Sequence, residues 1–154
     1  MGIFIGFLIT AIIQSSSVTV SILLLMAQQG LLPLGICFYI ILGCNIGACT
    51  SALLASLNGN KDAKRAALIH FLFNVIGTVI MAVMLLLGES WVENMITTLS
   101  GGNIGRSVAN AHTLFKVFQV LILLPFSGAI VKMTYLSFPE RTKRPQTAAS
   151  SWNT

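Results

Sequence analysis

Four consecutive polar residues, Gln14-Ser15-Ser16-Ser17, interrupt an apolar stretch near the start of the chain, and Thr19 and Ser21 continue the polar run. If this interruption joins two half-helices, the carbonyl groups that end the first can coordinate a cation such as sodium. The N–H groups that begin the second favour an oxyanion, and serine hydroxyls can donate to phosphate oxygens without burying a fixed charge. The alternative is that the serines are small packing residues between membrane helices. A glutamine with three successive serines in an uncharged segment favours an ion site.

A second interruption, Gly43-Cys44-Asn45-Ile46-Gly47, precedes Thr50 and Ser51. Glycines allow a helix to unwind and to approach a ligand, and Asn45 offers both a carbonyl oxygen and an amide nitrogen. The same residues satisfy the G-x-x-x-G pattern of helix packing in membranes. The pattern therefore supports a binding site and a packing face equally.

The remaining polar residues in apolar surroundings give secondary candidates. His70 and His112 lack the acidic or cysteine neighbours of a metal site, so hydrogen bonding between helices is the favoured role. Lys116 lies well inside an apolar stretch, where a charge needs a partner, a cavity or a path to the interface. The secondary site candidates are Thr50, His70, Asn74 and Lys116.

The composition places these residues in a membrane. Of 154 residues, 55% are hydrophobic and only 8% are charged, and no charge occurs before Lys61. A soluble surface cannot be built from such a sequence. The net charge of +5 arises from short basic groups rather than from a nucleic-acid-binding face. The chain contains no catalytic motif and no cofactor-binding motif, so neither an enzyme nor a cofactor is expected.

Four stretches are long enough to enter or cross a bilayer, at residues 3–29, 31–57, 66–88 and 107–137. The first predicts a re-entrant helical hairpin with the Gln-Ser-Ser-Ser turn near its tip, because each arm is half a span long. The second predicts either another hairpin or a discontinuous, broken helix. The last two predict ordinary spans. Asn58, Asn60 and Asp62 offer helix caps before the third, and Pro125 predicts a kink in the fourth.

Basic residues predict the orientation in the membrane. Lys61, Lys64 and Arg65 precede the third stretch, and the fourth is followed by Arg141, Lys143 and Arg144. The connection between these stretches carries Glu89, Glu93 and Arg106, and its segment 91–99 is expected at the outer interface. The positive-inside rule predicts that both basic ends, including a disordered polar tail at 139–154, are cytoplasmic.

Three segments together resemble a known family. They are residues 10–17, the Gly43-x-Asn45-Ile46-Gly47 motif, and residues 66–74 with the sequence Ala-Ala-Leu-Ile-His-Phe-Leu-Phe-Asn. With Ala-Asn-Ala-His-Thr-Leu-Phe at 109–115, they resemble the sodium-phosphate cotransporters of the type II kind, including the bacterial members. The similarity covers most of residues 2–137.

The resemblance implies an all-α integral membrane protein in which two inverted repeats enclose one site for sodium and phosphate. This chain corresponds to one repeat, residues 1–138, which resembles the second of the two more closely. The implied substrate and sodium ligands are Gln14, Ser15, Ser16, Ser17, Asn45 and Ser51. Sodium is expected to bind through Gln14, Ser15 and Asn45. The sequence departs from the family where Ala48 and Cys49 replace threonines and where Lys116 replaces an asparagine.

The expected function is therefore sodium-coupled transport of inorganic phosphate by alternating access, in the inner (plasma) membrane. One repeat cannot enclose the site, so we expect a fragment, a chain that pairs with a second half, or a homo-oligomer. An inverted homodimer is disfavoured by the one-sided basic charge. The alternative function is a non-transporting membrane subunit whose serine, glycine and histidine residues serve helix packing and assembly.

Overall fold

The computed structural model describes residues 1–137, which form helices joined by short turns and contain no strand. The elements are α1 (Gly2–Ile13), α2 (Ser16–Gln28), α3 (Leu34–Gly47), α4 (Cys49–Ser56), α5 (Lys61–Leu99), α6 (Ile104–Leu123), the 3₁₀ helix η1 (Leu124–Phe126) and α7 (Ser127–Ser137). Three stretches are long and apolar enough to cross a membrane: Leu34–Ser56, Lys61–Leu99 and Ile104–Ser137. The prediction of an all-α, multi-pass membrane protein is confirmed.

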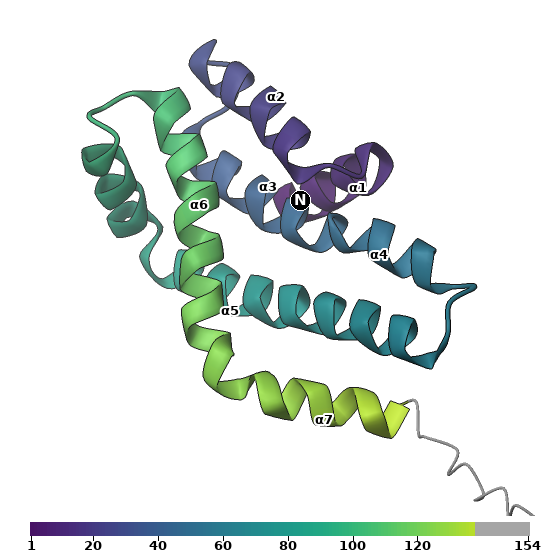
Figure 1. Ribbon diagram of the computed structural model, residues 1–154. Coiled ribbons are helices and arrows are strands. Elements are labelled where there is room, and N and C mark those ends of the chain that lie inside the picture. Colours follow the sequence, from purple (N-terminus) through teal and green to yellow (C-terminus); the bar gives the residue numbers. More distant parts are fainter. Residues whose placement is uncertain (138–154) are drawn as a thin grey trace, which may run out of the picture.

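The first predicted stretch, 3–29, forms two short helices joined at Gln14 and Ser15. With 12 and 13 residues, α1 and α2 are each roughly 20 Å long, too short to cross a hydrocarbon core of about 30 Å. The two arms pack against different neighbours, α1 mainly against α3 and α2 mainly against α6 (Figure 1). The helix–turn–helix expected from the sequence is present, and its re-entrant placement stays a prediction.

The second stretch, 31–57, is almost one continuous helix. Gly43–Gly47 lies inside α3, and only Ala48 separates α3 from α4, with right-handed dihedral angles of φ −63° and ψ −20°. Figure 1 shows α3 and α4 running on in nearly the same direction. The prediction of a second hairpin is therefore wrong, and so is the prediction that the helix unwinds at Gly43–Gly47. The one interruption lies at Ala48.

Close packing of α1 against α3 explains why Gly43–Gly47 stays helical. A Cβ atom on Gly43 would collide with the backbone of Ile3 and Phe7, and one on Gly47 would meet the backbone carbonyl of Phe7. Gly6 of α1 lies in the same way against the backbone of Ile40. These glycines are used for contact between helix backbones, as in other small-residue membrane interfaces.

Helix α5 begins at a side-chain cap and is kinked near its end. The Asn60 carboxamide oxygen accepts a hydrogen bond from the Ala63 N–H at 2.9 Å, which confirms Asn60 as a cap among the candidates. Gly88 has non-helical angles of φ −152° and ψ 38°. The segment that follows turns back beside α6 (Figure 1), where Val92 and Ile96 share an apolar pocket with Leu114. The predicted span 66–88 ends at this kink, and the interfacial position of 91–99 stays a prediction.

The fourth stretch is kinked where Pro125 was predicted to bend it. Helix α6 ends at Leu123, η1 contains Pro125, and α7 then turns away to run beside α5 (Figure 1). Proline has no N–H to donate to the preceding turn, which accounts for the break. The predicted tail at 139–154 and its three basic residues lie outside the described residues.

The core is centred on α3, which contacts α1, α2, α5 and α6. Phe38, Ile41 and Leu42 of α3 are fully buried. Phe38 meets Phe115 of α6 edge to face, with ring centroids 5.8 Å apart. Because α3 lies among these four helices, its one polar amide, Asn45, is buried.

Candidate functional site

The Gln14–Ser15 turn is fixed by backbone geometry and one helix cap. Gln14 adopts the left-handed conformation, with φ 58° and ψ 23°, and its N–H donates to the Thr10 carbonyl at 2.6 Å. The Ser15 hydroxyl accepts a hydrogen bond from the Val18 N–H at 3.4 Å and caps α2. The chain therefore stops one helix and starts the next within two residues, as the sequence predicted.

The start of α2 presents unpaired polar groups. In a helix, the first N–H groups have no carbonyl partner within the helix. Here these belong to Ser16 and Ser17, whose hydroxyl groups also donate to no atom of residues 1–137. Ser17 and Gln14 are exposed and Ser16 is half-buried. Backbone and side-chain donors are thus gathered at the positive end of a helix dipole.

A buried pair of hydroxyl groups holds the two arms together behind this turn. The Thr10 hydroxyl in α1 donates to the Thr19 hydroxyl in α2 at 3.1 Å, and the Thr19 hydroxyl donates to the Ser15 carbonyl at 3.1 Å. Thr10 was not among the predicted site residues. The signal available in the sequence was a threonine four residues before Gln14 in an otherwise apolar run.

The C-terminal end of α3 lies beside the turn. A Cβ atom on Gly47 would lie 2.8 Å from the Cβ of Thr10 and 3.1 Å from the backbone nitrogen of Ala11. The end of α1 therefore packs directly on the helix that carries Asn45. This contact brings the two predicted polar clusters into one region of the fold.

Asn45 is buried with no hydrogen-bond partner for its side chain. Its exposed fraction is 1%, and within the described chain neither Oδ1 nor Nδ2 forms a hydrogen bond. The residues about one turn before and after it face α5, because the Leu42 carbonyl of α3 accepts from the Thr78 hydroxyl at 3.3 Å and the Cys49 thiol of α4 donates to the His70 carbonyl at 3.7 Å. Asn45 therefore points towards the α3–α5–α6 core.

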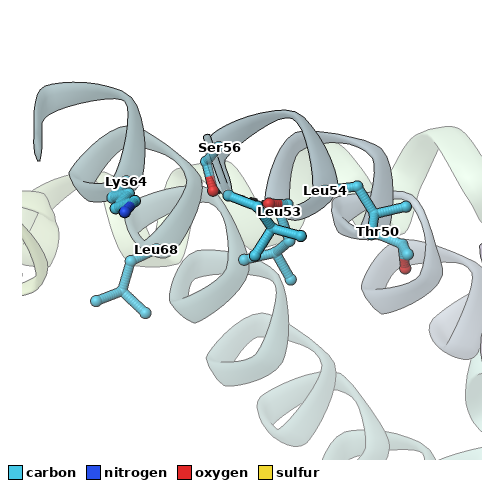
Figure 2. Close-up of a pocket in the computed structure, with 7 residues that line it drawn as sticks. Thr50, Leu53, Leu54, Ser56, Lys64 and Leu68 are labelled. Carbon is cyan, nitrogen blue, oxygen red and sulfur yellow. Dashed lines mark hydrogen bonds between the residues drawn. The ribbon is translucent and has the colours of Figure 1, made fainter. Parts of the chain in front are cut away.

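The structure separates Ser51 and Thr50 from Asn45. Ser51 is exposed on α4, and its hydroxyl donates to the Ala48 carbonyl at 3.2 Å. Thr50 is half-buried and lines a cavity of about 340 Å³ between α4 and α5 (Figure 2). Most of that lining is apolar, with Leu53, Leu54, Leu57 and Leu68 beside Ser56 and Lys64. This cavity is therefore not where the unpaired polar groups gather.

The other secondary candidates also differ in burial, since some are buried in the core and others are exposed. The Asn74 amide donates to the His70 carbonyl at 2.9 Å and is buried. The His70 imidazole is exposed and forms no hydrogen bond within residues 1–137, so the predicted bridge between helices is wrong for His70. The His112 Nε2 atom is buried without a partner. Lys116 lies half-buried on α6.

Gln119 belongs to the same buried cluster and was missed from the sequence. Its amide nitrogen donates to the Phe73 carbonyl at 3.2 Å and to Asn74 Oδ1 at 3.4 Å, while its Oε1 atom has no partner among the described residues. Its exposed fraction is 4%, and it lies against Gly77. A lone amide in the apolar run 117–124 was the available signal.

Comparison with known proteins gives a consistent set of relatives. The family described as Na+/Pi-cotransporter matches residues 1–90 of the chain. The uncharacterized protein YqeW of Bacillus subtilis is 31% identical over 140 residues, which cover 91% of this chain and 44% of that protein. No solved structure matches.

Two kinds of animal transport protein are also similar. Human sodium-dependent phosphate transport protein 2B is 36% identical over 130 residues, or 82% of this chain and 17% of that protein. Mouse sodium-dependent phosphate transport protein 2C is 38% identical over 81 residues, or 50% of this chain and 14% of that protein. The chain thus spans less than half the length of each of these relatives.

Proposed function

Because the chain belongs to the Na+/Pi-cotransporter family, we propose that it carries inorganic phosphate together with sodium across the membrane, as one half of a transport unit that works by alternating access. The observation that carries this proposal is the Gln14–Ser15 turn. There the carbonyl end of α1 and the N–H end of α2 meet within two residues. One place in the fold therefore offers acceptors for a cation and donors for an oxyanion.

The ligands proposed for phosphate and sodium are those implied by the family resemblance. At the turn they are Gln14, Ser15, Ser16 and Ser17, and on the facing helices they are Asn45 and Ser51. Sodium is proposed to bind through Gln14, Ser15 and Asn45. Three facts support the turn: its exposure, its two free N–H groups and its unpaired serine hydroxyls.

The secondary ligands carry less structural support. Asn74 is buried beside the Cys49 thiol and His70 carbonyl, which favours a supporting position behind Asn45. Thr50 lies at the apolar cavity, and the His70 side chain is exposed. Lys116 is half-buried on α6 and forms no hydrogen bond or ion pair among the described residues.

The proposed location is the inner (plasma) membrane, with the basic ends and the C-terminal tail in the cytoplasm. Lys61, Lys64 and Arg65 begin α5. The Arg65 guanidinium lies over the Tyr135 ring, 4.3 Å from its centroid, so the end of α7 is held beside them. Residues that leave α7 therefore start on the same side as the first basic group, as the positive-inside rule requires.

A second half is proposed to complete the site. The chain covers 44% of YqeW and 17% of human protein 2B, so the longer relatives contain more than the matched segment. Gln14 and Ser17 are exposed at the turn, which leaves room for a facing element. The proposed partner is another transporter half or a second copy of this chain, in contact with the lipid bilayer.

Uptake of phosphate into liposomes tests this function. The purified 154-residue chain is reconstituted, and uptake is compared under inward gradients of sodium and of potassium. We expect sodium-dependent uptake that Gln14→Ala abolishes. If the folded chain alone is inactive, the assay is repeated with a co-expressed second half. Absence of sodium-dependent uptake from that folded complex would contradict the proposal.

A non-transporting membrane subunit is the second candidate, and the glycine contacts favour it. Gly6, Gly43 and Gly47 bring α1 and α3 into backbone contact, as an assembly module also requires. The Ser16→Ala variant separates the candidates. Lost phosphate binding by a normally folded variant supports transport. Unchanged binding with lost assembly supports the subunit.

A further inference from the structure

The cavity of about 340 Å³ between α4 and α5 has an apolar wall and one cationic end. Four of its seven lining residues are leucines, which come from α4, from the turn after it and from α5. Lys64 is the only charged residue of the seven. In Figure 2, Lys64 lies at one end of the cavity and Thr50 at the other, with Leu53 between them. The cavity therefore changes from charged to apolar along its length.

The apolar wall continues onto the surface of the protein. Helix α4 packs mainly against α5, and its contacts with α1 and α3 are few. Leu54 and Leu57 are 52% and 65% exposed, whereas Leu53 and Leu68 are half-buried. In a membrane protein, exposed leucines of a spanning segment face lipid tails. The cavity is thus continuous with a surface that acyl chains reach from the bilayer.

Lys64 lies at the end of α5 where a lipid head group is expected. Helix α5 begins at Lys61 and is long and apolar enough to cross a membrane. Lys64 is therefore only roughly 5 Å along the helix axis from its start, and Leu68 is one turn deeper. Lysine side chains near the ends of spanning helices extend their ammonium groups to the interface. The cation is accordingly at the level of head groups and the leucines are at the level of tails.

The Lys64 ammonium has no partner in the described part of the chain. The neighbouring Arg65 pairs with Asp62 at 2.9 Å and lies over the Tyr135 ring. Lys64 forms no hydrogen bond or ion pair within residues 1–137, although its side chain is half-buried. It also lies near the positive end of the α5 dipole, where negative groups are favoured. Three donors and a positive charge are therefore available to an anion at this end of the cavity.

We propose that this cavity binds one anionic glycerophospholipid, with an acyl chain along the leucines and the phosphate at the Lys64 ammonium. The tail gives little selectivity, because lipid tails are as apolar as leucine and gain nothing by leaving the bilayer. The head group decides which lipid binds. A head group with net negative charge is attracted to Lys64, whereas a choline head group brings a positive charge of its own. Lipid binding here does not depend on phosphate transport.

A second copy of this chain is a poorer match for the cavity. An apolar helix face would cover the leucines, but it would bury the Lys64 charge unless it also supplied a carboxylate. On the Lys64 side, Asp62 is already paired with Arg65. Glu89 and Glu93 lie near Gly35 at the start of α3, at the far end from α4. A copy in the same orientation therefore brings no unpaired carboxylate of residues 1–137 to Lys64.

Native mass spectrometry of bound lipid tests the proposal. The full 154-residue chain in detergent is titrated with dioleoyl-phosphatidylglycerol and with dioleoyl-phosphatidylcholine, and circular dichroism and size-exclusion chromatography check folding. We expect one phosphatidylglycerol per chain, bound about fivefold more tightly than phosphatidylcholine, as for one lysine near an anionic surface. Lys64→Gln is expected to remove this preference and Lys64→Arg to keep it. Lys61→Gln is the matched control, because it removes the same charge three residues away from a residue outside the lining, and it is expected to keep most of the preference.

Equal affinities of the folded natural chain for the two lipids would overturn the proposal. Equal losses in Lys61→Gln and Lys64→Gln would also overturn it, because they would show a diffuse surface attraction. Displacement of the lipid by millimolar inorganic phosphate would assign Lys64 to a free oxyanion instead. If the glutamine variant does not fold, Lys64→Met provides a second neutral side chain.

A photo-cross-linking residue at the exposed position of Leu54 identifies the occupant in native membranes. A cross-link to phospholipid is expected. A cross-link to a second copy of the chain at this position would overturn the proposal.

Discussion

The Gln14–Ser17 turn and the α3–α5–α6 core use polar residues in opposite ways. At the turn, exposed or half-buried side chains surround backbone groups that the ends of two helices leave free. In the core, Asn45 and Gln119 are almost fully buried, and the fold supplies only part of their hydrogen bonds. A ligand can therefore reach the polar groups at the turn from outside. In the core, the hydrogen bonds of the polar side chains also contribute to the stability of the fold.

This difference teaches where a substitution acts. Removing a side chain at the turn leaves few native contacts broken, so binding is expected to change more than folding. Removing one in the core breaks hydrogen bonds between helices, so folding is expected to change first. Substitutions in each region test that contrast, as does one in the α1–α3 contact that supports both regions.

The largest effect is expected from Gly43→Ala in the α1–α3 contact. The new Cβ would collide with the backbone of Ile3 and Phe7, which must then separate from α3. We expect a loss of stability of about 3 kcal/mol or more, in line with overpacked cores. Gly128→Ala in α7 is the matched control, since no atom lies within 4 Å of its Cβ position. Thermal unfolding in detergent measures both, and equal midpoints would contradict the close helix contact.

The next effect is expected from Gln14→Gly at the turn. Gln14 has φ 58°, a conformation that costs a side chain about 1 kcal/mol and glycine very little. We therefore expect unchanged or slightly higher stability together with at least about tenfold weaker sodium-dependent phosphate uptake, or about 1.4 kcal/mol. Unfolding and uptake are measured on the same preparation. Normal uptake by the glycine variant would exclude the Gln14 side chain from the site.

A smaller effect on stability is expected from Gln119→Leu in the core. The substitution removes two hydrogen bonds, to the Phe73 carbonyl and to Asn74 Oδ1, and leaves the latter without this donor. We expect a loss of about 1 kcal/mol, typical of a buried hydrogen bond. A double-mutant cycle with Asn74→Leu isolates the interaction energy between Gln119 and Asn74. Strictly additive losses of stability would show that the two amides do not interact.

The smallest effect is expected from Thr10→Val, which removes one hydroxyl of the pair behind the turn. The Thr10–Thr19 hydrogen bond measures 3.1 Å and is buried. Such bonds between membrane helices average about 0.6 kcal/mol in double-mutant cycles. We expect that loss of stability from Thr10→Val, and a further loss when Thr19→Val is added, because Thr19 also donates to the Ser15 carbonyl; the double-mutant cycle then gives the Thr10–Thr19 coupling energy. If uptake falls by more than a loss of about 0.6 kcal/mol corresponds to, the hydroxyl pair also positions the turn.

Much of the local architecture was predictable from the sequence. The polar run at Gln14–Ser17 predicted a helix break, Asn60 a helix cap and Pro125 a kink, and all three are present. Each depends on the chemistry of a few neighbouring residues. The prediction for Gly43–Gly47 failed because glycines permit unwinding and close packing alike, and only the position of α1 selects packing.

The fold places the predicted ligands Asn45 and Ser51 in different surroundings, because helix packing decides which residues are buried. Asn45 and Ser51 are six residues apart, yet Asn45 is buried in the core and Ser51 is exposed on α4. Gln119 could not be connected with Asn74 from the sequence, because 45 residues separate them and the contact depends on how α5 packs against α6.

The sequence by itself determined the membrane setting, the all-α class, the family and the position of the polar turn. These follow from composition, from short-range backbone chemistry and from motifs that lie within single segments. The tertiary structure alone decided that α3 stays helical through Gly47 and that Asn45 and Gln119 are buried with unpaired amide atoms. The physical reason is that helix faces contact one another across long sequence separations, so burial and unpaired groups arise only when particular faces are packed together.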